Sequence, residues 1–308
     1  NKVMKNILIT GGAGFIPSSL ASRLLLDDKI FLVLVDNLLT GKLSNLPKSN
    51  RCSFYNIDVN DYELIKDVMY KYKFDYIFHY AAVVGVKRTI ENPLLVLNDI
   101  EGIKNILSLS VKCNVKKVFF SSSSEVYGEP VELPMNETTT PLNSRLPYAI
   151  VKNIGEAYFK SYYKEYGLDF TIFRFFNTYG IKQSDDFVLS RFLQAALKNE
   201  DITIYGDGKQ SRTFCYIDDN IDLTINCLEK YIYTNDIINV GSDIIYTIKE
   251  LADLIIKLLD SKSKIIYLPE LKEGDMSRRQ PDISKMKQII NHPLISLENG
   301  IKNIIREL

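Results

Sequence analysis

The sequence has little of the residues from which metal and redox sites are usually built. Its 308 residues include no tryptophan, only two histidines (His79 and His292) and only four cysteines, which lie at positions 52, 113, 215 and 227. The cysteines lack the short spacings of a metal site. Two histidines leave no basis for a multi-histidine centre or for histidine-based catalysis. We therefore predict that the protein binds no metal and that its thiols are reduced, as in a cytoplasmic protein.

Charge and hydropathy exclude further classes of partner. Lysine and arginine number 38 and so do aspartate and glutamate, which gives a formal net charge of zero. A balanced chain lacks the basic surplus that attracts nucleic acid or an anionic membrane. No apolar run reaches the roughly 20 residues of a membrane span. The N-terminal residues lead into an apolar strand instead of showing signal-peptide architecture, so we expect no membrane partner and a cytoplasmic location.

The spacing of apolar residues predicts an α/β fold. Short apolar strands over residues 6–10, 31–36, 76–79, 117–121 and 170–175 alternate with helices over 18–27, 62–70, 93–113 and 146–166. This alternation is typical of a doubly wound parallel sheet (Rossmann-type) that is covered on both faces. After residue 180, shorter strands mix with helices. We predict a sheet domain over 1–180 and a smaller α+β substrate-binding domain over 181–308, with part of 216–243 returning to the sheet domain.

A glycine-rich turn between the first strand and the first helix predicts a dinucleotide site. Gly11 and Gly14 in Thr-Gly-Gly-Ala-Gly-Phe-Ile let the backbone approach a pyrophosphate at the helix N-terminus. Asp36 ends the second strand, where a carboxylate binds the ribose hydroxyls and repels a 2′-phosphate. No arginine follows it, which favours NAD over NADP. Pro17 takes the place of the third glycine, a departure that we expect to affect cofactor affinity more than fold.

A Tyr-x-x-x-Lys pattern supplies a candidate base. Tyr148 and Lys152 are four residues apart within a predicted helix and so lie on one face. A neighbouring ammonium favours the phenolate and lowers a pKa that begins near 10. Together with the glycine turn, this predicts that an alcohol loses its proton while its hydride leaves for a nicotinamide.

Several further motifs occur in a fixed order along the chain. They are His79-Tyr-Ala-Ala82, Ser121-Ser-Ser-Ser-Glu-Val-Tyr-Gly128, Phe176-Asn-Thr-Tyr-Gly180, Arg212-Thr-Phe-Cys-Tyr-Ile-Asp218 and Arg279-Gln-Pro-Asp282. With the two motifs above, the chain resembles the extended short-chain dehydrogenase/reductase family, in its NAD-dependent nucleotide-sugar epimerase/dehydratase group. The resemblance covers nearly the whole chain, although Ile181 replaces the proline that is usual after Tyr-Gly.

The resemblance implies a role for each matching residue. Tyr148 would be the catalytic base, Lys152 would bind the nicotinamide ribose, and Ser123 would hydrogen-bond the reacting alcohol. The implied cofactor-binding residues are Gly11, Gly14, Phe15, Ile16, Asp36, Asn37, Asp58, Val59, Ala81, Ala82, Asn98, Ser121, Tyr148 and Lys152. The implied substrate-binding residues are Ser123, Ser124, Asn177, Arg191, Arg212 and Arg279 or its neighbour Arg278.

The residues after Ser123 bear on the second step of the reaction. The resemblance implies that group members first oxidise the sugar to a 4-keto intermediate, and we predict a nucleotide-sugar 4-epimerase, which needs no further base. Glu125 keeps open a dehydratase or a UDP-glucuronate decarboxylase that would use this carboxylate, although Ser124 stands where a dehydratase carries an acid. Glu125 could equally be a helix cap or an ion-pair partner. A catalytically silent NAD-binding protein is a further alternative.

The resemblance also implies partners and a setting. The group pairs two long helices across a two-fold axis, which implies a homodimer here through residues 93–113 and 146–166. The candidate contacts are the apolar residues Ile103, Ile106, Leu107, Ile154, Tyr158 and Tyr162. The expected substrate is a nucleotide-diphosphate sugar, and the expected setting is carbohydrate biosynthesis.

Overall fold

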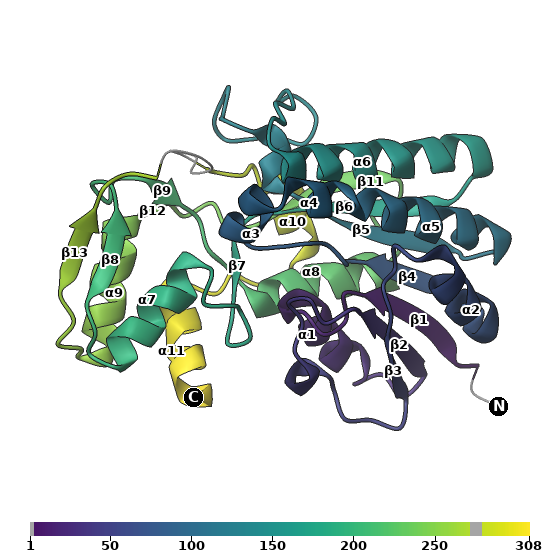
Figure 1. The fold of residues 1–308 in the computed structure, drawn as a ribbon, viewed down its shortest axis with the longest axis horizontal. Coiled ribbons are helices and arrows are strands. Elements are labelled where there is room, and N and C mark those ends of the chain that lie inside the picture. The colour runs from purple at the N-terminus through teal and green to yellow at the C-terminus, as the bar shows by residue number, and fades with distance from the viewer. Residues whose placement is uncertain (1–2, 272–278) are drawn as a thin grey trace.

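A seven-stranded sheet forms the body of the protein. The structure, a computed structural model, describes residues 3–271 and 279–308. The strand order is β11-β6-β5-β4-β1-β2-β3, and every neighbouring pair is parallel (Figure 1). The strands are β1 (Lys5–Thr10), β2 (Ile30–Asp36), β3 (Cys52–Asn56), β4 (Tyr76–His79), β5 (Lys117–Ser123), β6 (Asp169–Phe175) and β11 (Asp236–Val240). The predicted doubly wound parallel sheet is confirmed.

Helices cover both faces of this sheet because its strands are apolar on both sides. In β1, Ile7 and Ile9 face one core and Leu8 faces the other, as alternation along a strand requires. The first core packs against α1 (Phe15–Leu24) and α8 (Ile217–Glu229). The second packs against α2 (Tyr62–Tyr72), α5 (Asp99–Lys112) and α6 (Pro147–Tyr166), and α5 and α6 lie side by side (Figure 1).

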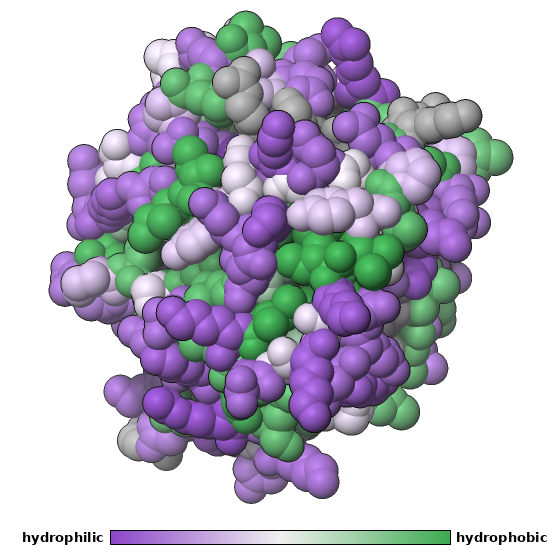
Figure 2. Space-filling view, turned by 90° about the vertical axis from the view of Figure 1, so that its left-hand side faces the viewer, coloured by the Kyte–Doolittle hydropathy of each residue, from purple (hydrophilic) through white to green (hydrophobic). Residues whose placement is uncertain are grey.

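A smaller lobe follows β6. It contains the short strand pairs β7 (Thr178–Tyr179) with β10 (Cys215–Tyr216), β9 (Ser211–Arg212) with β12 (Tyr246–Thr247), and β8 (Ile202–Tyr205) with β13 (Ile265–Leu268). Its helices are α7 (Val188–Leu197), α9 (Ile248–Leu259) and α11 (Leu297–Glu307). Figure 2 views the molecule from the side of this lobe, where apolar groups are interspersed among polar ones. Between the small strands, the chain returns to the large sheet through α8 and β11.

The remaining elements are short. They are α3 (Val86–Glu91), α4 (Pro93–Leu97), α10 (Ser284–Ile289) and the 3₁₀ turns η1 (Leu43–Asn45) and η2 (Ser124–Tyr127). Within residues 3–271 and 279–308, no helix combines the length and the apolar character that crossing a membrane requires.

The prediction of one continuous helix over 93–113 is wrong. The segment is divided at Asn98 into α4 and α5, because the N–H of Glu101 bonds to the Asn98 carbonyl three residues back instead of to a carbonyl four residues back. Asn98 itself keeps helical dihedral angles. The division is therefore a local tightening of the helix.

Three of the predicted dimer contacts lie in the core of the chain itself. Ile103, Ile106 and Leu107 are at most 2% exposed and pack against the second face of the sheet. The sheet already buries this stripe of α5, so these three side chains are not available to a second subunit.

Candidate active site

One cavity of about 730 Å³ lies at the carboxyl ends of the strands, between the sheet and the smaller lobe. This is the edge at which doubly wound folds bind ligands. With one exception, every residue that the sequence assigned to cofactor, substrate or catalysis and that the structure describes lines this cavity. Asn98 is the exception, since it is exposed and does not line it. Arg278, named as an alternative to Arg279, lies outside the described residues.

The glycine turn forms a close-packed cradle at the start of α1. Gly11 has φ of +69°, and a Cβ added there would lie 2.9 Å from the Ala81 Cα atom. Gly14 is the N-cap of α1, and its N–H bonds back to the Gly11 carbonyl at 2.9 Å. The first turn of α1 carries no acidic side chain, so its free N–H groups and positive dipole end are open to a phosphate. Pro17 is the third residue of α1, where a missing N–H interrupts no helical bond.

Asp36 is held in one orientation at the end of β2. Its Oδ2 accepts a hydrogen bond from the Ala13 N–H at 3.0 Å, and its Oδ1 accepts one from the Leu38 N–H at 2.7 Å. Burial raises the pKa of Asp36, while these two hydrogen bonds act in the opposite direction. Each carboxylate oxygen still has a lone pair for a hydroxyl donor. The cradle and this carboxylate together fit the pyrophosphate and ribose of NAD.

One face of α6 carries three polar side chains at four-residue intervals, namely Tyr148, Lys152 and Glu156. Lys152, only 4% exposed, donates from Nζ to the Ser121 carbonyl at 2.6 Å. Glu156 accepts from the Ser122 hydroxyl at 2.6 Å and forms a buried ion pair with Arg174 at 2.7 Å. These contacts fasten α6 to β5 and β6. Sequence reasoning missed Glu156 and Arg174, although the eight-residue spacing from Tyr148 to Glu156 was a usable signal.

The pKa shifts differ from the sequence prediction. Burial raises the pKa of Tyr148, and the negative charge of Glu125 raises it further, while a hydrogen bond with Ser123 lowers it. Burial lowers the pKa of Lys152 to about 8, opposed by the charge of Asp99. The predicted lowering of the phenol pKa is therefore wrong for the protein alone. The main reason is burial, which penalises the phenolate because a charged group loses its hydration there.

Glu125 lies in an ion pair in the lining of the cavity. Its Oε1 accepts from the Nη2 of Arg279 at 2.5 Å, and its backbone N–H donates to the Ser123 hydroxyl at 3.2 Å. The ion-pair interpretation that the sequence left open is thus observed. Two further arginine atoms stand out in the same region: the Nε atoms of Arg279 and Arg191 are buried and have no hydrogen-bond partner among the described residues. Unpaired buried donors of this kind fit an anionic ligand.

Polar residues that the sequence analysis missed also line the cavity, among them Asp99, Gln183, Asp186 and Gln210. Asp99 begins α5, and its Oδ2 accepts from the Val83 N–H at 2.8 Å. Asn98, the residue before it, is the predicted cofactor residue that does not line the cavity. The Asn177 and Arg212 side chains line the cavity as expected.

A comparison with protein families identifies the chain. Residues 7–241 match the model of the NAD dependent epimerase/dehydratase family. The protein belongs to this family. It is therefore an NAD-dependent enzyme, in agreement with the cradle, Asp36 and the Tyr-x-x-x-Lys pair described above.

Individual relatives carry several reactions. The chain is 34% identical to a putative UDP-glucose 4-epimerase from Methanocaldococcus jannaschii, and the match covers 97% of both chains. It is 36% identical to a UDP-N-acetyl-alpha-D-glucosaminuronate decarboxylase from Bacillus cytotoxicus, over 98% of this chain and 97% of the other. Among solved structures, UDP-glucose 4-epimerase from Thermotoga maritima superposes with a TM-score of 0.91 at 32% identity, over 98% of this chain and 99% of that one.

Proposed function

We propose that this family member is a nucleotide-sugar 4-epimerase that acts through a 4-keto intermediate. The observation that carries the proposal is the state of Glu125. The core of the first oxidation, Ser123, Tyr148 and Lys152, lines the same cavity as the NAD cradle. Glu125, the acidic side chain that follows Ser124, is engaged by Arg279. Epimerisation needs the Ser-Tyr-Lys group and no additional acid or base. This cavity contains that group, and its further carboxylate, Glu125, is already paired.

Each member of the group has a separable task. Tyr148, hydrogen-bonded with Ser123, accepts the proton of the substrate alcohol, and Ser123 orients that alcohol. Lys152 keeps a positive charge close to the phenol while bonded to Ser121. The glycine turn and Asp36 would hold NAD⁺, which would supply the hydride acceptor and a positive charge that favours the phenolate. Lys152 and bound NAD⁺ together would offset the raised pKa of Tyr148.

The arginines of the cavity support a diphosphate-linked substrate. The Nε atoms of Arg191 and Arg279 have no hydrogen-bond partner within residues 3–271 and 279–308, and Arg212 also lines the cavity. These guanidinium groups are planar donors that match phosphate oxygens. Burial lowers the pKa of Arg191, as expected when a guanidinium is removed from water. Both similar relatives act on UDP-sugars by name. We infer a nucleotide-diphosphate sugar as the substrate class, with a uridine nucleotide favoured.

One observation favours a second candidate, a uronate decarboxylase. Arg279 pairs with the Glu125 carboxylate inside the cavity, and a substrate carboxylate would compete for the same guanidinium. The Bacillus cytotoxicus relative is a decarboxylase by name. A dehydratase is less well supported, because Ser124 stands at the expected acid position and is 2% exposed.

We also infer a cytoplasmic homodimer. Large apolar side chains are exposed on α4 and α6: Leu94 is 81% exposed, Leu95 42%, Tyr163 43% and Tyr166 60%. The partly exposed Ile154, Tyr158 and Tyr162 on α6 are the predicted contacts that stay available. Light scattering after size-exclusion chromatography tests this inference, and a monomeric mass at micromolar concentration would contradict it.

The function is tested with a panel of UDP-, GDP-, CDP- and dTDP-sugars and uronates in the presence of NAD⁺. Products are separated by chromatography that resolves epimers and are then weighed by mass spectrometry. An isomer of unchanged mass supports the 4-epimerase. A product that has lost carbon dioxide would replace it with the decarboxylase, and one that has lost water would replace it with a dehydratase. Tyr148→Phe is the control, since each of these products requires the first oxidation.

A further inference from the structure

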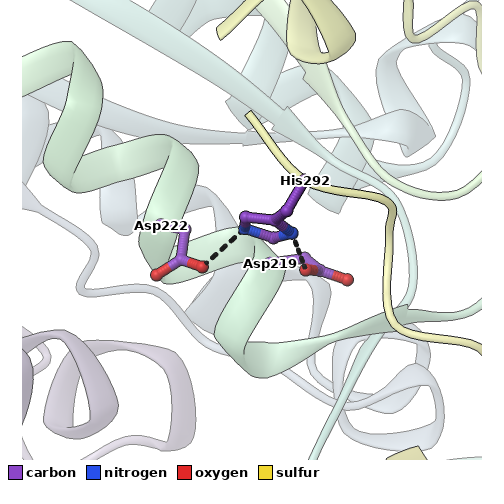
Figure 3. Close-up of side chains that lie close together, drawn as sticks. All are labelled: Asp219, Asp222 and His292. Carbon is purple, nitrogen blue, oxygen red and sulfur yellow. Dashed lines mark hydrogen bonds and ion pairs between the residues drawn. The ribbon is translucent and has the colours of Figure 1, made fainter. Parts of the chain in front are cut away.

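A histidine and two aspartates join α8 to the segment between α10 and α11. His292 lies in that segment, and Asp219 and Asp222 lie three residues apart on one face of α8 (Figure 3). The ring lies between the two carboxylates, with Nε2 3.0 Å from Asp222 Oδ2 and Nδ1 3.9 Å from Asp219 Oδ1 (Figure 3). None of the three side chains lines the active-site cavity. Their role is therefore independent of the proposed function.

Each ring nitrogen of His292 faces an acceptor oxygen. Nδ1 lies 2.9 Å from the carbonyl of Pro293, which cannot donate, so Nδ1 carries a hydrogen. Nε2 faces Asp222, whose other oxygen forms an ion pair with Arg23. A carboxylate that is paired with a guanidinium has no hydrogen to donate, so Nε2 must carry one as well. These contacts therefore describe the positively charged form of the ring.

A positive ring also suits the buried carboxylate beside it. Asp219 is 1% exposed, and its Oδ2 accepts from the Ile295 N–H at 2.8 Å. Its Oδ1 has no hydrogen-bond partner among the described residues and faces the His292 ring. A buried carboxylate oxygen without a partner is costly unless a positive charge lies close to it. His292 supplies that charge as long as the ring is protonated.

The other charged groups nearby leave this balance to His292. Asp218 is a third carboxylate at this end of α8, and it lies near Arg23 of α1. The charged side chains of α10 and α11 on either side of the segment are paired elsewhere: Lys285 with Asp236, Lys287 with Asp243, and Glu298 with Lys302. The bond to the Pro293 carbonyl raises the pKa of His292 above its ordinary 6.5, and the carboxylates act in the same direction.

The two helices that this contact connects both hold β7. Gly300 of α11 packs so closely against Tyr179 that an added Cβ would lie 1.8 Å from the Tyr179 hydroxyl. Asn220 of α8 donates to the Thr178 hydroxyl at 3.2 Å. Thr178 in turn lines the active-site cavity. The contact between α8 and the chain before α11 therefore supports a strand that borders the cavity.

We propose that His292, Asp219 and Asp222 form a pH-sensitive clasp that ties the chain before α11 to α8. In the protonated state, the ring donates to Asp222 and offsets the buried charge of Asp219. When Nε2 loses its hydrogen, two acceptors face each other and the attraction is lost. The chain before α11 is then released from α8, and α11 packs less firmly against β7.

The direction of the pH dependence follows from linkage. The folded protein holds the His292 proton more tightly than the unfolded chain, whose histidine has a pKa near 6.5. The clasp therefore contributes its full stability below pH 6.5 and loses it as the pH rises through the higher pKa of the folded state. Burial raises the pKa of Asp219 to about 6, so this carboxyl titrates below the window in which the clasp opens.

Proton NMR measures the charge of His292 directly, because the chain has only two histidines. The variant His79→Asn assigns the two sets of ring signals. We expect His292 to titrate with a midpoint above 6.5, and we expect Asp222→Asn to lower that midpoint. A midpoint at or below 6.5, or one that Asp222→Asn leaves unchanged, would overturn the proposal.

Hydrogen exchange and thermal unfolding measure the release of α11. Below pH 6.5, His292→Gln should speed amide exchange in α11 about two- to fivefold, as expected for a partly exposed ion pair, and should lower the thermal midpoint. Both differences from the original protein should disappear as the pH rises through the His292 midpoint. This comparison cancels groups such as Lys117 that titrate in both proteins.

The matched control is Asp253→Asn, which removes a surface carboxylate paired with Lys249 and should leave exchange in α11 unchanged at every pH. Two results would contradict the clasp. Equal exchange in the original protein and His292→Gln below pH 6.5 would mean that the ring does not hold the segment. A difference that persists undiminished above the His292 midpoint would mean that the ring holds it by packing and not by charge.

Discussion

The buried ion pair between Glu156 and Arg174 offers the sharpest test of how the catalytic helix is held. Glu156 is 1% and Arg174 2% exposed, and Arg174 binds the carboxylate through Nε at 3.1 Å and Nη2 at 2.7 Å. Arg174 also donates to the Tyr127 hydroxyl at 2.9 Å. We predict that Glu156→Gln strongly destabilises the protein, because it preserves shape but leaves the guanidinium charge buried without a counter-charge.

The size of the expected loss in unfolding free energy follows from the burial of both Glu156 and Arg174. Removing one member of a buried pair costs about 3–5 kcal/mol, far more than the roughly 0–1 kcal/mol of an exposed pair. For 308 residues, at about 2.1 cal/mol/K of unfolding entropy per residue, this corresponds to a fall of about 5–8 °C in the thermal midpoint. Turnover should fall as well, since Tyr148 and Lys152 share the face of α6 that Glu156 anchors.

Urea and thermal unfolding of the Glu156→Gln variant measure its loss of stability. Asp253→Asn is the matched control, because its pair with Lys249 is about half exposed and should change stability by less than about 0.5 kcal/mol. Replacing Glu156 and Arg174 together with methionine should recover part of the loss, since no buried charge then remains. A loss below about 1 kcal/mol for Glu156→Gln would refute the reasoning, because it would mean that water or another group compensates Arg174.

Three further predictions concern the site and the core. Tyr148→Phe should reduce turnover by at least about 100-fold with little change in NAD affinity measured by calorimetry, and unchanged turnover would remove the tyrosine from the mechanism. Asp36→Ala should weaken NAD binding relative to NADP because the 2′-phosphate is no longer repelled; an unaltered ratio of dissociation constants would place ribose selection elsewhere. Burial lowers the pKa of His79 to about 3, below the 6.5 of the unfolded chain, so the unfolded state binds the extra proton and stability is lost as pH falls below 6.5. His79→Asn should lack this component, at most about 1.4 kcal/mol per pH unit, and a difference between the two proteins that stays constant from pH 6.5 to about 4 would contradict it.

Local sequence patterns determined the fold class of this protein and the main residues of its nucleotide site. The alternation of apolar strands and amphipathic helices predicts the parallel sheet, since a strand buried on both faces must be apolar throughout. The glycine turn, Asp36 and the Tyr148–Lys152 spacing are short-range patterns as well. Each depends on backbone geometry within a few residues or on the end of one strand, which is why the sequence alone places them in a nucleotide site.

Tertiary structure decided how the side chains are paired and charged. Glu125 meets Arg279 across 154 positions, and His292 meets Asp222 across 70. Such pairs depend on how distant elements pack, and that packing cannot be predicted from the local periodicity of the sequence. The raised pKa of Tyr148 has the same origin, because burial and the negative charge of Glu125 outweigh the effect that the helical spacing from Lys152 predicted. Sequence thus determined which chemistry the fold offers, and packing determined which charges face one another.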